Sequence, residues 1–279
     1  MPVYPNILQA IGGTPLVRLN KVCGPDDAAV YAKCEFMNPG GAIKDRMALF
    51  ILDKAEREGT IKPGATIVEN TSGNTGMGVA LWAAVKGYRC IFTMPDKMST
   101  EKVNALKAFG AEVVVTPTNV PAEDPRSYYE TAKRIHRETP GSFMLNQYHN
   151  KDNIEAHYHS TGGELIADCE KAGLTPDFFV AGLGTGGTMS GAGKRLKERW
   201  PHLKPTAEAG GLPGGPDNPL GSRALYLFQG NKDTMYRIHG TNEPEKIGHN
   251  VSSGCIRMRD IDAIDLYNRV KIGTKVVVL

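Results

Sequence analysis

The stretch from Thr66 to Lys86, TIVENTSGNTGMGVALWAAVK, decides the fold class of this chain. It opens with the β-branched and apolar residues of a strand, Thr66–Glu69, and closes with the helical pattern Gly76–Lys86. Between them lies a turn of Gly, Ser, Thr and Asn residues, which leaves backbone N–H groups exposed at a helix start. This order of strand, turn and helix is the first half of a βαβ unit, and the neighbouring sequence repeats it.

Short apolar runs alternate with amphipathic stretches from Thr14 to about Trp200. Because strands separated by helices favour parallel pairing, this region predicts an α/β fold with a parallel sheet. We expect its strands at Ala29–Cys34, Thr66–Glu69, Arg89–Met94, Glu112–Val115 and Phe178–Ala181. We expect its helices at Asp45–Glu58, Gly76–Lys86, Ser99–Phe109, Ser127–Glu138, Asn153–Lys171 and Thr188–Arg199.

The pattern changes near residue 205, where the chain becomes dense in Gly and Pro over Ala209–Gly221. We therefore expect two domains, residues 1–205 and residues 206–279, the second small and mostly β. Its predicted elements are strands at Arg223–Phe228, Met235–His239 and Thr274–Leu279, and a helix at Asp260–Val270.

Composition excludes several classes of partner. A net charge of +3 over 279 residues gives no basic surface for nucleic acid or anionic lipid. The five cysteines are scattered without a CxxC pair, which argues against a disulfide framework and against a metal site. The first ten residues lack the features of a signal peptide, and no apolar run approaches the ~20 residues of a membrane span. We expect a cytoplasmic protein.

Three glycine-rich turns precede predicted helices and could each cradle an anion. They are Asn38–Arg46, which carries Lys44 at a helix start, Asn70–Gly76 and Ala181–Thr188. The last contains a GxGxxG match, but the acidic residue of a nicotinamide site is missing, because no strand precedes Glu208. Lys44 does not belong to a P-loop either, since no GxxxxGK[ST] surrounds it.

Together the three turns resemble the pyridoxal-phosphate enzymes of the cysteine synthase and cystathionine β-synthase family. The likeness runs from Ile11 to about Pro205 and includes Met94–Ser99, Gly110–Val113 and Asn146–Tyr148. It implies the fold-type II sheet of that family, pyridoxal 5'-phosphate as cofactor and a homodimer. It also implies β-replacement or β-elimination on serine-type amino acids, with a thiol as the second substrate.

The resemblance also implies roles for individual residues. Lys44 would condense with the cofactor's aldehyde, and Asn74 would contact its ring hydroxyl. The substrate carboxylate would be held by Thr71, Ser72, Gly73, Thr75 and Gln147. The cofactor phosphate would be held by Gly184, Thr185, Gly186, Gly187 and Thr188.

The last 75 or so residues carry a second candidate site, in which His239 precedes Cys255 by sixteen residues. An imidazole that takes the thiol proton makes cysteine a strong nucleophile, and the turn from Ser253 to Cys255 could form an oxyanion hole. A phosphatase motif, CxxxxxR, fails because Ile261 occupies the arginine position. A buried structural cysteine is the alternative interpretation.

Residues from about Pro205 to Leu279 resemble the catalytic half of the YkuD-type L,D-transpeptidases, which act on peptidoglycan peptides. The segments that carry the likeness are Gly215–Gly221, Ala224–Leu227, Arg237–Asn242, Ile247–Gly248, the Cys255 turn and Gly273–Val277. It implies that Cys255 is the acyl-accepting nucleophile, that the Gly240 carbonyl orients His239 as its base, and that Arg257 shapes the donor-peptide site. Ser253 replaces the histidine that this family often has there.

Neither likeness covers the whole catalytic region of its family, and the two families work in different compartments. We therefore predict a chimera, natural or artificial. Three hypotheses follow: a β-replacing pyridoxal-phosphate enzyme impaired by truncation, a thiol acyltransferase, and a fusion without catalysis. The first is preferred because it accounts for about three quarters of the residues.

Overall fold

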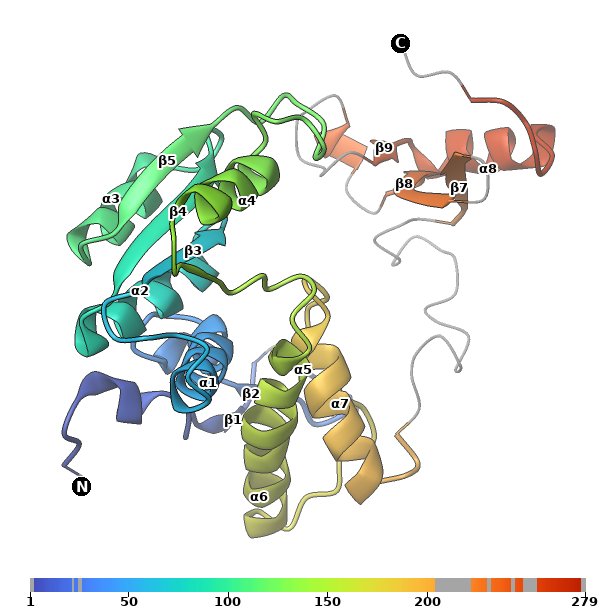
Figure 1. The fold of residues 1–279 in the computed structure, drawn as a ribbon. Coiled ribbons are helices and arrows are strands. Elements are labelled where there is room, and N and C mark those ends of the chain that lie inside the picture. The colour runs from blue at the N-terminus through green and yellow to red at the C-terminus, as the bar shows by residue number, and fades with distance from the viewer. Residues whose placement is uncertain are drawn as a thin grey trace. The chain divides into compact units, whose positions relative to one another are not determined.

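The computed structural model describes residues 3–21, 23–24, 27–203, 222–229, 232–241, 244–247 and 255–276. Contacts within the chain divide it into two compact units, Met1–Leu203 and Lys204–Leu279. Figure 1 shows the elements of each unit.

A four-stranded parallel sheet organises the first unit. Its order is β5–β4–β3–β6, and Thr66 of β3 is in register with Arg89 of β4. The strands are β3 (Thr66–Asn70), β4 (Arg89–Pro95), β5 (Glu112–Thr116) and β6 (Phe143–Met144). The predicted α/β fold with a parallel sheet is confirmed, while the short β6 was not predicted.

Five of the helices lie where the sequence periods predict them. They are α1 (Lys44–Arg57), α2 (Asn74–Lys86), α3 (Thr100–Ala108), α4 (Tyr128–Glu138) and α7 (Gly187–Arg199). Local chemistry explains their ends: the Ser127 side chain accepts the N–H of Glu130 at the start of α4, and Gly87 ends α2 in the left-handed region with φ 79°.

The predicted helix Asn153–Lys171 is helical throughout but is not one regular helix. It consists of α5 (Asp152–His157), a π-helical turn η3 (Tyr158–Gly162) and α6 (Gly163–Lys171). A π-helical turn changes the phase of the side chains that follow it, so the faces of α5 and α6 cannot be read from one period.

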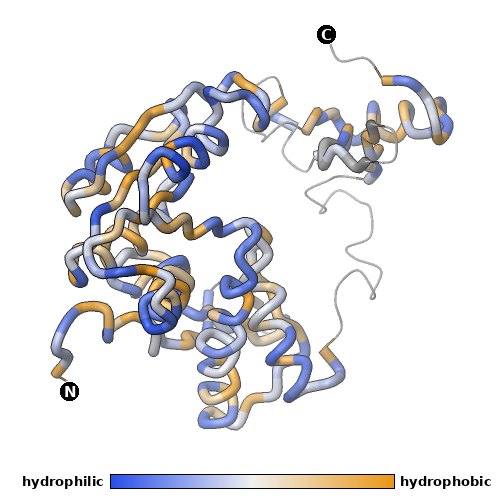
Figure 2. Tube along the Cα trace, in the orientation of Figure 1, coloured by the Kyte–Doolittle hydropathy of each residue, from blue (hydrophilic) through white to orange (hydrophobic). Residues whose placement is uncertain are grey.

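The core of the first unit lies between the sheet and helices α1 and α2. Trp82, Phe92, Met47 and Ile67 are fully buried there. In Figure 2 hydrophobic residues follow the long strands, whereas α4 is largely hydrophilic. Gly78 lets α2 approach the start of α1, since a Cβ at this position would lie 3.0 Å from the Asp45 Cα. Close packing therefore fixes the helix end that carries Lys44.

Two strand predictions need correction. The stretch Ala29–Cys34 yields β2 (Tyr31–Lys33), which pairs antiparallel with β1 (Leu16–Arg18) in a separate sheet instead of joining the parallel one. Phe178–Ala181 is not a strand, because it pairs with no strand in the described part of the chain. Its side chains Phe178 and Val180 are 80% and 89% exposed. Two 3₁₀ turns, η1 (Ile7–Ala10) and η2 (Glu35–Met37), complete the unit.

In the residues that the structure describes, the second unit contains a three-stranded sheet in the order β7–β8–β9 and one α-helix. Strands β7 (Ala224–Gln229) and β8 (Lys232–His239) are antiparallel, and β9 (Ile256–Arg257) pairs parallel with β8. The 3₁₀ turn η4 (Pro244–Lys246) follows β8, and α8 (Asp260–Arg269) follows β9.

Strands β7 and β8 and helix α8 confirm the predictions for the second unit, and β9 was not predicted. The predicted strand Thr274–Leu279 is wrong where it is described, because residues 274–276 are not in a strand. Its last three residues and Ala209–Gly221 lie outside the described residues.

In the part of the chain that the structure describes, no helix is long and apolar enough to cross a membrane.

Candidate active site

Lys44 is the first residue of α1, immediately after the glycine turn that begins at Asn38. The Asp45 carboxylate accepts the N–H of Gly40 and so ties this turn to the helix. The Asn38 side chain accepts the N–H of Gly12, which joins the turn to the N-terminal segment. The backbone on both sides of Lys44 is therefore held in place.

Arg46 adds a buried ion-pair network two residues further on. Its guanidinium, with 1% of the side chain exposed, donates to Glu35 at 2.7 Å and to Glu164 at 2.6 Å. Burial of Glu164 by itself raises its pKa, but hydrogen bonds from Arg46, Gly13 and Lys33 outweigh burial and lower the pKa to about 2. The start of α1 is thereby pinned to α6 by charges that stay ionised.

The Lys44 amine reaches the third glycine turn. Its Nζ donates to Thr185 Oγ1 at 3.2 Å, across 141 residues of sequence. Burial lowers the pKa of Lys44, because removal of water disfavours its charged form. The free amine is the nucleophilic form, so an amine suited to attack a carbonyl lies beside a glycine turn.

That turn is built around two glycines. Gly186 adopts a left-handed conformation with φ 83°, and Gly187 opens α7. A Cβ at Gly187 would lie 2.1 Å from Asn153 Oδ1, so only glycine fits there. No side chain in the described ranges caps α7. The first-turn N–H groups, with the Thr185 and Thr188 hydroxyls beside them, can therefore bind an anion.

Asn153, which the sequence analysis treated only as a helix start, connects two parts of the site. Its Nδ2 donates to Thr185 Oγ1 at 2.9 Å and to the Gln147 carbonyl at 3.0 Å. Its Oδ1 is buried without a partner among the described residues. In the sequence, the only indication of this role was an amide side chain at the first turn of an amphipathic helix.

The second glycine turn is held together by its own hydroxyls. Thr71 Oγ1 accepts the N–H groups of Gly73 at 3.0 Å and Gly76 at 3.1 Å. Thr75 Oγ1 donates to Gln147 Oε1 at 2.6 Å. Four of the residues predicted to hold the substrate, Thr71, Gly73, Thr75 and Gln147, are therefore brought together, and Ser72 and Asn74 are exposed at the same turn.

Glu69 is a second residue that the sequence analysis missed. It is fully buried at the end of β3, where its carboxylate accepts the N–H groups of Asn146 at 2.7 Å and Gln147 at 3.2 Å. Burial raises the pKa of Glu69 to about 7. Asn146 has a positive φ of 54°, so Glu69 holds a strained backbone that presents Gln147.

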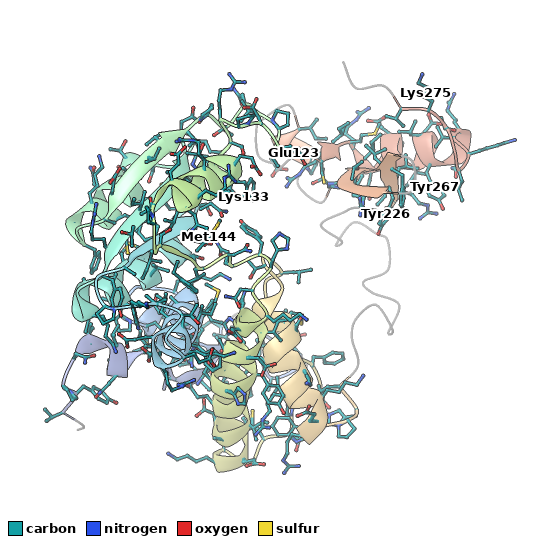
Figure 3. All side chains as sticks on the ribbon, viewed as in Figure 1. Glu123, Lys133, Met144, Tyr226, Tyr267 and Lys275 are labelled. Atoms are coloured by element: carbon teal, nitrogen blue, oxygen red, sulfur yellow. The ribbon has the colours of Figure 1, made fainter. Side chains whose placement is uncertain are left out.

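Strand β6 brings the segment that contains Asn146 and Gln147 to the second glycine turn. Met144, labelled in Figure 3, is in register with Val68 of β3. The chain after β6 therefore runs past the carboxyl end of β3, where the second glycine turn begins. Ligands of parallel α/β sheets bind at this end of the strands.

The second unit contains the candidate histidine of the second site. His239 is buried at the end of β8, and its Nδ1 is hydrogen-bonded to the Gly240 carbonyl. His239 is in register with Arg257 of β9. Strand β9 begins at the residue after Cys255. Ser253 and Gly254, which belong to the predicted oxyanion hole, lie outside the described residues.

The first site fits a phosphorylated aldehyde. The observations are the buried amine of Lys44, whose pKa is lowered and which lies 3.2 Å from Thr185 Oγ1, and the start of α7, whose first-turn N–H groups no described side chain caps. Within the described ranges, no group of His, Cys, Asp or Glu side chains is placed to hold a metal ion. The fold and the site are those of the class of α/β proteins that place a buried lysine beside a glycine turn suited to the phosphate of such a cofactor.

Comparison with known proteins gives the family. A model of pyridoxal-phosphate dependent enzymes matches residues 7–209. The chain belongs to this family, whose members depend on pyridoxal phosphate. Residues 210–279 lie outside the match.

Individual relatives agree with that family. Cystathionine beta-synthase of Oryctolagus cuniculus is 50% identical over 202 residues, which are 71% of this chain and 36% of that protein. Cysteine synthase of Staphylococcus aureus is 51% identical over 199 residues, 71% of this chain and 62% of that protein. The O-acetylserine dependent cystathionine beta-synthase from Helicobacter pylori superposes with a TM-score of 0.66 at 36% identity, covering 73% of this chain and 65% of that one. The chain thus spans between about a third and two thirds of the length of these relatives.

Proposed function

We propose that this chain catalyses β-replacement or β-elimination on a serine-type amino acid, with pyridoxal phosphate bound through Lys44 and with a thiol as second substrate. The hydrogen bond between Lys44 Nζ and Thr185 Oγ1 is the observation that carries the proposal, because it joins the amine to the candidate phosphate turn. Relatives about half identical to the chain, named cystathionine beta-synthase and cysteine synthase, support the reaction class.

Pyridoxal phosphate, when bound, withdraws electrons from the α-carbon of the amino acid, which allows the β-substituent to leave and a thiol to add. Lys44 would supply the amine that holds the cofactor aldehyde. Its Nζ, when not engaged there, would accept the α-proton of the amino acid, and burial favours the unprotonated form that this role needs.

The remaining residues bind and orient. The turn Gly184–Thr188 and the positive end of α7 would hold the phosphate. The turn Thr71–Thr75 with Gln147 would hold the substrate carboxylate, and Asn74 would contact the ring hydroxyl. Asn153 bridges the two turns and so fixes the distance between the groups they bind.

The test is to add pyridoxal phosphate to the purified chain and to follow its visible absorbance and its conversion of an O-acylated serine and a thiol. We expect Lys44→Ala to lose both signals. Lys133→Ala is the matched control, because that lysine has an exposed side chain on α4 (Figure 3). Full conversion by Lys44→Ala would refute the proposal. We also propose a homodimer, as the family resemblance implies, which sedimentation of the holoprotein tests.

A second candidate function, acyl transfer through Cys255, belongs to residues 206–279, which we propose to be a separate transpeptidase-like domain in a chimeric chain. The contact between His239 Nδ1 and the Gly240 carbonyl favours it, because it leaves the other ring nitrogen for a proton transfer. The parallel pairing of His239 with Arg257 brings the chain after Cys255 beside the histidine strand. Peptidoglycan peptides are the proposed substrate class.

Mass spectrometry after carbapenem treatment tests this candidate. We expect an adduct on Cys255 that forms more slowly in His239→Ala. Cys90 is the internal control, because burial raises the pKa of its thiol to about 12. An unmodified Cys255 contradicts acyl transfer, and negative results at both sites would favour the third hypothesis, a fusion without catalysis.

A further inference from the structure

His157 lies between the candidate phosphate turn and the π-helical turn η3, and neither proposed reaction uses it. Its side chain is fully buried at the last position of α5. Nδ1 lies 2.9 Å from Thr161 Oγ1, and Nε2 lies 3.3 Å from Thr188 Oγ1. Thr188 is in the first turn of α7, so one imidazole connects the interior of η3 to the phosphate-binding end of that helix.

The close approach of three helical elements creates this contact. A Cβ at Gly191 of α7 would lie 2.2 Å from the Ile154 carbonyl of α5, and a Cβ at Gly162 would lie 2.7 Å from the Arg195 Cβ. Only glycine allows the helices to pack at this distance. The π-helical turn that begins after His157 places Thr161 against the same imidazole. Such turns interrupt regular helices at functional sites.

The imidazole is neutral in this position. Burial, together with the positive charges of Lys44 and Arg46, lowers the pKa of His157 to about 4. A neutral imidazole has one N–H donor and one nitrogen acceptor. The two threonine hydroxyls can therefore be arranged with it in only two ways, which differ in the direction of every hydrogen bond.

We propose that His157 is a positioning residue for the cofactor phosphate, acting through Thr188. Thr161 donates its hydroxyl proton to Nδ1, and Nε2–H donates to Thr188 Oγ1. The Thr188 oxygen thereby has its acceptor role filled, and its own proton is left for an anion at the start of α7. The opposite arrangement would consume the Thr188 proton inside the protein. This inference rests on the proposed cofactor site, and it assigns a role to a residue that contacts that site through Thr188.

The group that this hydroxyl would recognise is a phosphate, because the charged phosphate oxygens accept hydrogen bonds. A donor hydroxyl aimed at a charged acceptor forms a stronger hydrogen bond than a neutral pair does. Loss of its orientation should weaken phosphate binding about tenfold and should leave the aldehyde end of the cofactor unaffected.

The experiment compares dissociation constants for pyridoxal phosphate and for pyridoxal, which lacks the phosphate, in the full chain. In His157→Asn the amide reaches the Nδ1 position but not Thr188, so we expect about tenfold weaker binding of pyridoxal phosphate and unchanged binding of pyridoxal. In His157→Gln the amide nitrogen can take the place of Nε2, so we expect the wild-type preference for the phosphorylated form. Equal losses for both ligands, or none, would overturn the proposal.

A double-mutant cycle removes the remaining ambiguity. We expect the combination of His157→Asn with Thr188→Val to bind no worse than Thr188→Val alone, because both changes remove one interaction. Additive losses would contradict a role through Thr188. Should His157→Asn fail to fold, Thr161→Val provides the same comparison with a smaller selective loss. A wild-type chain that binds neither ligand refutes the proposed function itself, a result distinct from a wild type that binds and a variant without selectivity.

Discussion

The Lys44 amine and the Thr185 hydroxyl lie 3.2 Å apart although 141 residues separate them in sequence. Thr185 also accepts a hydrogen bond from Asn153 Nδ2, which in turn holds the Gln147 carbonyl. One hydroxyl thus links the start of α1, the turn before α7 and the segment that follows β6. The three glycine turns meet through these contacts.

Replacing Thr185 with valine removes the acceptor shared by Lys44 and Asn153. We expect about tenfold weaker binding of pyridoxal phosphate, because the hydrogen bonds from Lys44 and Asn153 are lost and the turn is disturbed. Thr185→Ser keeps the hydroxyl and should bind as the wild type does. A titration in which valine and serine variants bind equally well would show that the hydroxyl has no such role.

Gly187 and Gly163 form a matched pair for testing the packing of the phosphate turn. A Cβ at Gly187 would lie 2.1 Å from Asn153 Oδ1, whereas a Cβ at Gly163 would meet nothing within 4 Å. We expect Gly187→Ala to lower the free energy of unfolding by about 2 kcal/mol or more. Gly163→Ala, in helix α6, should raise it or leave it unchanged. Urea denaturation of both variants measures the difference, and equal stabilities would contradict the packing argument.

Glu69 predicts a pH dependence of stability. Burial raises its folded-state pKa from 4.5 to about 7, so the protonated form is the one favoured by folding. The contribution of Glu69 to stability is therefore fully present below pH 4.5 and is lost as the pH rises through about 7. Between about pH 4.5 and 8, the wild type should lose up to about 3 kcal/mol relative to Glu69→Gln. Parallel pH profiles of the two proteins in chemical denaturation would exclude a raised pKa.

Thr75 is expected to affect the amino acid and not the cofactor. Thr75→Val leaves Gln147 Oε1 without its donor at 2.6 Å, in a buried environment. Amino-acid binding to the cofactor-loaded chain, followed by its spectral change, should weaken about tenfold, while affinity for pyridoxal phosphate stays the same. Thr75→Ser should restore binding. A parallel loss of cofactor affinity would mean that the two turns are not separate in function.

Local sequence patterns were sufficient for most of the sheet and helices. The runs at Thr66–Glu69 and Arg89–Met94 are buried on both faces of a parallel sheet except at Arg89, and they are therefore rich in β-branched and apolar residues. Ala29–Cys34 and Phe178–Ala181 have similar composition, but their outcome depends on pairing partners. The first found an antiparallel partner in β1, and the second pairs with none of the described strands. Strand propensity does not encode the partner.

The supporting residues of the site could not be predicted from the sequence for a related reason. Glu69, Asn153 and His157 gain their importance from contacts made across the fold, at sequence separations that no motif spans. The single amphipathic helix expected over Asn153–Lys171 concealed the π-helical turn, and with it the position of His157 beside Thr161. Glycine turns, by contrast, could be found because their backbone geometry requires particular residues in sequence order.

The most direct test is to reduce the chain with borohydride in the presence of pyridoxal phosphate and to locate the modified residue by peptide mass spectrometry. Residue 44 should carry the label at one equivalent per chain, ahead of every exposed lysine. A label distributed over surface lysines, with the peptide containing residue 44 unmodified, would contradict the central claim that this amine receives the cofactor.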